Sequence, residues 1–157
     1  MSGRILIVGY GNPLRGDDGV GWLAAQQLAA HYADDPSVAV ITAHQLTPEL
    51  AEPISSAEIC LLIDAEEGGD PGGIRVTKVD PTVVQEGLFS HHVDPATLVA
   101  CAGELYGNTP QAYLYTVAGG SFDCEEALSD PVSAALSLLL DQIRSVVSER
   151  RNIPSAG

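Results

Sequence analysis

The sequence predicts an α/β protein with a largely parallel β-sheet that helices cover on both faces. Short, continuously apolar runs alternate with longer segments in which apolar residues recur at helical spacing. Such runs are typical of strands buried on both sides, and their alternation with helices is typical of parallel sheets. The expected order of elements is βαβαβ(β)αβα. The four buried strands are expected at Arg4–Val8, Val38–Thr42, Ile59–Ile63 and Tyr113–Val117.

The helices of the first half follow from apolar spacing and from turn residues. A first helix is expected from near Gly19 to about His31, because apolar residues recur there every three or four positions. The segment Asp34-Asp35-Pro36 ends it. A second helix should start at Thr47-Pro48, with the threonine as N-cap and the proline at the first helical position.

The helices of the second half each start at an aspartate followed by proline. Asp94-Pro95 opens one helix, which Gly107 ends, and Asp130-Pro131 opens a longer one. The buried stripe of the shorter helix is expected to comprise Leu98, Cys101 or Ala102, and Leu105. The apolar stripe of the longer helix comprises Val132, Leu136, Leu139, Ile143 and Val147.

One strand breaks the alternation. The run Ile74–Val79 is more polar than the others, and no helix fits between Ile63 and Ile74 to carry a right-handed crossover. We therefore expect this strand to pair antiparallel, near an edge of the sheet. The chain has 157 residues, a hydrophobic fraction of 45%, and no repeat or linker, so a single domain spanning residues 1–157 is expected.

Charge and hydropathy exclude several classes of partner. Seven Lys and Arg residues against 21 Asp and Glu residues give a net charge of −14. Nucleic acid and anionic membranes each need a basic face, so neither is an expected partner. No apolar run is long enough to span a bilayer, and Ile5–Val8 is too short for a signal peptide. A cytoplasmic protein is expected.

The first loop resembles a dinucleotide-binding fingerprint only in part. Gly9 and Gly11 fit the pattern, but Leu14 stands at the position of the third glycine. Two carboxylates, Asp17 and Asp18, also stand where a pyrophosphate would need bare amide donors. A nucleotide site is therefore not favoured.

Three strand ends supply candidate metal ligands, because ligands of open α/β sheets bind beyond the carboxyl ends of the strands. Asp18 could cap the following helix, or the Asp17-Asp18 pair could bind a cation. Asp64 ends a buried strand, where an unpaired carboxylate would be costly. Two carboxylates and one imidazole would suit a borderline divalent metal. The imidazole could come from His44, after the second strand, or from the loop pair His91-His92.

The ordered motifs resemble those of the nickel–iron hydrogenase maturation endopeptidases. The first is the run Ile-Val-Gly-Tyr-Gly-Asn-Pro-Leu-Arg-Gly-Asp-Asp-Gly-Val-Gly at Ile7–Gly21. The resemblance continues along nearly the whole chain, through Leu61–Ala65, Phe89–His92, the Leu98–Leu105 helix and Gly119–Asp123.

This resemblance implies a fold, an activity and a site. The fold is a three-layer α/β/α sandwich whose five-stranded, twisted, mostly parallel sheet has one antiparallel strand. The activity is removal of a C-terminal extension from a hydrogenase large-subunit precursor after nickel insertion. The implied metal-binding and catalytic trio is Asp18, Asp64 and His91. The nickel would be supplied by the substrate, with no organic cofactor.

One segment departs from the family pattern, and two other functions remain open. Many members carry a glycine-rich stretch after the second strand, where this chain has His44–Glu49. We expect His44 to line the cleft rather than to bind metal. The alternatives are a non-enzymatic module that binds a metal or small ligand, and an unrelated hydrolase that uses Ser121 or Cys124. Apart from that alternative, all three cysteines, Cys60, Cys101 and Cys124, are expected to be buried structural thiols.

Overall fold

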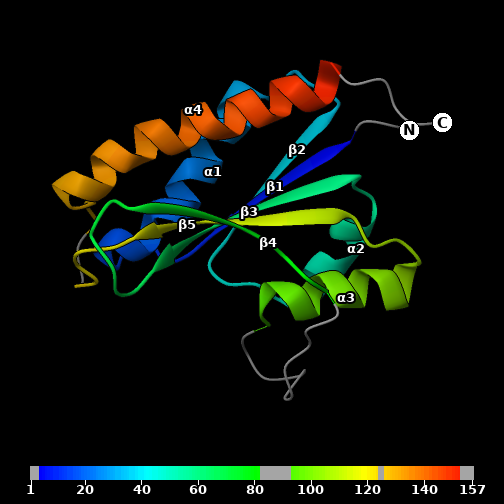
Figure 1. Ribbon diagram of the computed structural model, residues 1–157, viewed down its shortest axis with the longest axis horizontal. Coiled ribbons are helices and arrows are strands. Elements are labelled where there is room, and N and C mark those ends of the chain that lie inside the picture. The colour runs from blue at the N-terminus through cyan, green and yellow to red at the C-terminus, as the bar shows by residue number, and fades with distance from the viewer. Residues whose placement is uncertain (1–3, 82–92, 124–125, 153–157) are drawn as a thin grey trace.

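The computed structural model describes residues 4–81, 93–123 and 126–152 and contains one five-stranded sheet (Figure 1). The strand order is β2-β1-β3-β5-β4. Four strands are parallel, and the edge strand β4 pairs antiparallel with β5, as the sequence predicted. The strands are β1 (Ile5–Tyr10), β2 (Val38–Ala43), β3 (Ile59–Glu66), β4 (Ile74–Lys78) and β5 (Gln111–Ala118).

Helices cover both faces of this sheet. In Figure 1, α1 and α4 lie on one side, and α2 and α3 lie on the other. The core is correspondingly divided into two apolar clusters, one on each face of the sheet. The three-layer α/β/α sandwich is therefore confirmed. The helices are α1 (Val20–His31), α2 (Ala51–Ser55), α3 (Pro95–Tyr106) and α4 (Asp130–Asn152), with short 3₁₀ turns at Gly16–Gly19 and Pro48–Leu50.

The buried stripes of the later helices match the sequence prediction with one exception. All five residues predicted for α4 are buried. In α3, Leu98 and Ala102 are fully buried, but Leu105 is 68% exposed. The prediction for Leu105 was therefore wrong. Its helical position continues the stripe, but the helix ends one residue later at Tyr106, and the buried face of α3 comprises Thr97, Leu98, Val99 and Ala102.

The ends of α3 are fixed by local chemistry. The backbone N–H of Thr97 donates to the Asp94 carboxylate at 2.7 Å, which confirms the predicted N-cap. Gly107 has φ 83° and ends the helix in the left-handed conformation that glycine favours. The position of Asp94 is therefore well defined, and this residue borders the candidate site described below.

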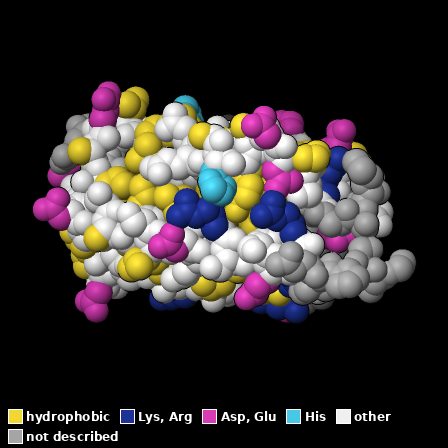
Figure 2. Space-filling model, turned by 90° about the horizontal axis from the view of Figure 1, so that it is seen from above, with side chains coloured by type: hydrophobic (Ala, Val, Ile, Leu, Met, Phe, Trp, Pro, Cys, Tyr) yellow, Lys and Arg dark blue, Asp and Glu magenta, His cyan; other side chains and the backbone are white. Residues whose placement is uncertain are grey.

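The basic residues of α4 do not form a basic surface. Figure 2 shows the face covered by α4, where Lys and Arg side chains lie among acidic ones. Arg144 forms an ion pair with Asp141, and Arg151 forms one with Asp35. These ion pairs offset part of the positive charge of α4. Among the residues that the structure describes, no helix is both long and apolar enough to cross a membrane.

Candidate active site

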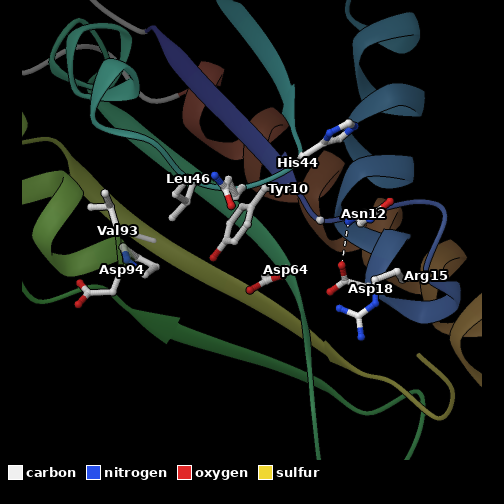
Figure 3. A pocket seen from close by; sticks show the side chains of 12 residues that line it. Tyr10, Asn12, Arg15, Asp18, His44, Leu46, Asp64, Val93 and Asp94 are labelled. Atoms are coloured by element: carbon white, nitrogen blue, oxygen red, sulfur yellow. Dashed lines mark hydrogen bonds between the residues drawn. The ribbon is translucent and has the colours of Figure 1, made fainter. Parts of the chain in front are cut away.

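A cleft of about 510 Å³ lies where the parallel strands end, between the first loop and the start of α3 (Figure 3). Its walls come from four segments that are far apart in the sequence: the β1–η1 loop, the segment after β2, the end of β3, and residues 93–95. The site therefore lies where the sheet rule predicted. The polar and charged side chains that line it include Tyr10, Arg15, Asp18, His44, Asp64 and Asp94.

The first loop is held tightly folded by glycine. Gly11 has φ 142°, and a β-carbon at this position would stand 2.0 Å from the backbone oxygen of Asp18. Only a residue without a side chain allows this approach. Of the two glycines that suggested a dinucleotide fingerprint, Gly11 therefore allows the backbone of Asp18 to lie against the end of β1, and Gly9 allows the backbone of Gly21 to do so.

Asp17 and Asp18, although adjacent, have different environments. Asp17 is fully buried and accepts hydrogen bonds from the backbone N–H groups of Gly120, Ser121 and Ser129 at 2.7–2.9 Å. The Ser129 hydroxyl donates a fourth hydrogen bond at 2.7 Å. Burial opposes ionisation, but these four donors hold the pKa of Asp17 below its usual range. Asp17 thus joins the first loop to the segment between β5 and α4.

Asp18 is half-buried and lines the cleft. Its carboxylate accepts a hydrogen bond from the backbone N–H of Asn12 at 2.9 Å. The possibility that Asp18 caps the first helix is wrong, because neither η1 nor α1 has a side-chain cap hydrogen bond. The reason is that the carboxylate turns back towards Asn12 instead of forward to the helix amides. Asp18 therefore remains available to a ligand in the cleft.

Asp64 lies on β3, in the same cleft as Asp18. Burial raises the pKa of Asp64 to about 7, and the negative charge of Asp18 contributes to this increase. The hydrogen bond from the Ala65 backbone N–H, at 2.7 Å, and the nearby Tyr10 hydroxyl act in the opposite direction. Two carboxylates that face the same cleft, one of them costly to ionise, are suited to receiving a cation.

The raised pKa of Asp64 predicts a stability effect. In the unfolded chain Asp64 loses its proton near pH 4, whereas in the folded protein it does so near pH 7. The folded state therefore binds more protons between these values, and the contribution of Asp64 to stability falls as the pH rises through this window. Without added metal, Asp64→Asn should be more stable than the wild type at pH 8 by about 2 to 4 kcal/mol and should show little gain at pH 4.

Urea unfolding of both proteins at several pH values measures this difference. The same substitution at the exposed Asp70 controls for the removal of one acidic side chain. A stability difference between Asp64→Asn and the wild type that stays constant from pH 4 to pH 8 would contradict the raised pKa.

The structure describes the position of only one of the three candidate histidine ligands. His44 lines the cleft, as expected, and its side chain is exposed. In Figure 3 its ring points away from Asp18 and Asp64. His91 and His92 lie outside the described residues, so the predicted ligand role of His91 stays a prediction. Val93, two residues after His91, lines the cleft. Within the described part of the chain, no group of three His, Cys, Asp or Glu residues could hold a metal ion.

The residues of the alternative hydrolase do not form a nucleophilic site where the structure describes them. The Ser121 hydroxyl hydrogen-bonds to Asp123 at 3.4 Å, and Ser121 is not among the described residues that line the cleft. Cys124 lies outside the described residues. Cys60 is fully buried, and this burial raises the pKa of its thiol to about 12, so it remains protonated and unreactive.

The architecture is that of the [NiFe] hydrogenase maturation proteases. The structure matches the maturation protease HycI from Thermococcus kodakarensis with a TM-score of 0.75, at 22% identity and covering 93% of each chain. It matches the hydrogenase maturating endopeptidase HybD from E. coli with a TM-score of 0.76, also at 22% identity and covering 93% of each chain. These matches bear out the fold that the motifs implied.

A sequence relative points the same way. The hydrogenase expression/formation protein HupD of Bradyrhizobium diazoefficiens is 26% identical over 168 residues, which cover 99% of this chain and 87% of HupD. No protein-family model matches the chain. The resemblance inferred from the motifs is thus confirmed by similarity along almost the entire chain.

Proposed function

We propose that this protein is a cytoplasmic endopeptidase that removes the C-terminal extension of a nickel–iron hydrogenase large-subunit precursor after nickel insertion. The observation that carries the proposal is the meeting of Asp18 and Asp64 in one cleft at the carboxyl ends of the strands. These are two of the three residues that the family motifs indicated. The third, His91, is proposed from the sequence alone.

The donor chemistry suits a nickel ion that the precursor carries. Two carboxylates and one imidazole are acceptable ligands for a borderline divalent metal, but a soft thiolate site on the client would hold it more firmly. In our proposal the cleft therefore recognises a nickel ion that the precursor already binds. The protein itself then needs no resident metal. Such a nickel ion could polarise the scissile carbonyl or a water molecule.

The protein's own side chains would prepare the cleft for this client. Asp64 has a pKa of about 7, so near neutral pH it can give up its proton when a cation arrives. Asp18 stays oriented by the Asn12 backbone amide. The net charge of −14 adds long-range attraction for a cationic centre on the partner. Recognition in this scheme depends on charge and metal together, which would delay cleavage until nickel is present.

The decisive experiment uses the precursor in two forms. The protein is mixed with a nickel-loaded large-subunit precursor, and in parallel with the same precursor lacking nickel. We expect a shortened large subunit, identified by mass spectrometry, only with the nickel-loaded form. Ser121→Ala provides a matched variant, because it tests the alternative nucleophile without altering the lining of the cleft.

Each other outcome has a definite meaning. Cleavage of both precursor forms would remove nickel recognition from the proposal. If the protein cleaves neither precursor form, and precursors from several hydrogenases give the same result, a non-enzymatic binding module would be favoured. Loss of cleavage in Ser121→Ala, with normal folding, would favour the alternative hydrolase.

A further inference from the structure

Tyr10 occupies an unusual place for an aromatic residue with a polar group. It is the last residue of β1, its side chain lines the cleft, and it is only 9% exposed. Its ring belongs to the apolar cluster on the α2 and α3 face, together with Leu46 and Val93. Figure 3 shows its hydroxyl directed into the cleft, towards Asp64. The ring is thus held by packing while the hydroxyl reaches a carboxylate of the candidate site.

Among the described residues, the hydrogen bond that fixes the Asp64 carboxylate is local. Its Oδ1 accepts a hydrogen bond from the backbone N–H of Ala65, the next residue in the chain, at 2.7 Å. A single hydrogen bond leaves the carboxylate group free to rotate about that contact. The Tyr10 hydroxyl comes from the neighbouring strand β1, and Figure 3 shows it facing Asp64. A donor at this place, together with the Ala65 amide, would restrict the direction in which the carboxylate oxygens face.

The phenol is the donor in this pair. Its hydroxyl carries a proton to donate, whereas an ionised carboxylate can only accept. Hydrogen bonds to an ionised acceptor are among the stronger ones.

We infer that Tyr10 is a positioning residue, whose hydroxyl donates to Asp64 and fixes the direction in which this carboxylate faces the cleft. The inference rests on the proposed function, because the group to be received is the nickel carried by the precursor. Hydrogen-bond partners of metal ligands commonly orient those ligands and increase metal affinity. Tyr10 would do this for Asp64 without touching the metal.

The test removes one oxygen atom. Tyr10→Phe keeps the ring in its apolar contacts and deletes the hydroxyl. We expect the dissociation constant for Ni²⁺, measured by titration calorimetry, to rise about tenfold. The kcat/KM for nickel-loaded precursor should fall by a similar factor. The matched control is Tyr115→Phe, because Tyr115 is 4% exposed, lies in the opposite apolar cluster and is not among the residues that line the cleft.

A metal-free measurement separates this inference from the proposed function. The carboxyl ¹³C chemical shift of Asp64 at pH 8 should change in Tyr10→Phe and stay constant in Tyr115→Phe. A wild-type protein that neither binds Ni²⁺ nor cleaves would contradict the proposed function, and the ¹³C shift would then still decide whether Tyr10 positions Asp64. An unchanged shift and unchanged Ni²⁺ affinity in Tyr10→Phe would overturn the inference. A lowered thermal midpoint alone would identify Tyr10 as a packing residue.

Discussion

Replacing Asp17 with alanine is expected to lower the free energy of unfolding by about 3 to 5 kcal/mol. The fully buried carboxylate accepts four hydrogen bonds, and its removal leaves three backbone N–H groups and one hydroxyl without their partner. The donors belong to residues that lie 103 to 112 positions after Asp17 in the sequence. The substitution therefore also disconnects the first loop from the segment before α4. Urea unfolding followed by circular dichroism measures the loss.

Asp17→Asn tests the same contacts with almost no change in volume. The amide retains one acceptor oxygen but turns an N–H group towards donors, so a substantial loss is expected here too. The neighbouring substitution Asp18→Ala removes only one described hydrogen bond and should cost about 1 kcal/mol. Equal destabilisation by Asp17→Ala and Asp18→Ala would show that the hydrogen bonds to Asp17 do not stabilise the fold as described.

Replacing Asp18 or Asp64 with asparagine is expected to abolish cleavage of the nickel-loaded precursor. The reduction in kcat/KM should exceed the roughly 10- to 100-fold typical of outer-shell substitutions, because these carboxylates are the proposed ligands themselves. An amide keeps the shape of the carboxylate but supplies neither its charge nor its donor strength to a metal. Product formation measured by mass spectrometry over a time course gives the ratio to wild type.

Stability measurements on the same variants make this prediction specific. Asp64→Asn should be inactive and yet more stable than the wild type at pH 8, because the substitution removes a carboxylate whose ionisation is disfavoured by burial. Loss of activity therefore could not be attributed to unfolding. Full activity in either Asp18→Asn or Asp64→Asn would exclude that residue from the site.

The architecture could be predicted from the sequence because its signals are local. Continuous apolar runs marked the buried strands, and the Asp94-Pro95 and Gly107 pattern marked both ends of α3. The polar run at Ile74–Lys78 indicated an antiparallel edge strand, which is what the sheet contains. Periodicity failed only at Leu105, where the helical pattern continues to the end of α3 although the residue is exposed.

The candidate site was predictable only in outline. Strand-end reasoning placed Asp18 and Asp64 at the same edge of the sheet, and the cleft brings them together. The stabilising role of Asp17 was missed, as was the placement of the Tyr10 hydroxyl beside Asp64. The Gly-Gly-Ser run at residues 119–121 was a possible signal for Asp17, because such turns present bare backbone N–H groups to an acceptor.

The sequence by itself determined the order of strands and helices and the glycine-rich loop that carries two adjacent aspartates. It could do so because secondary structure and turns depend on residues that are close along the chain. Only the tertiary structure decided which aspartate is buried against Gly120 and Ser129 and which one faces the cleft. The physical reason is that a carboxylate's role depends on its hydrogen-bond donors and its burial, and folding supplies both from distant parts of the chain.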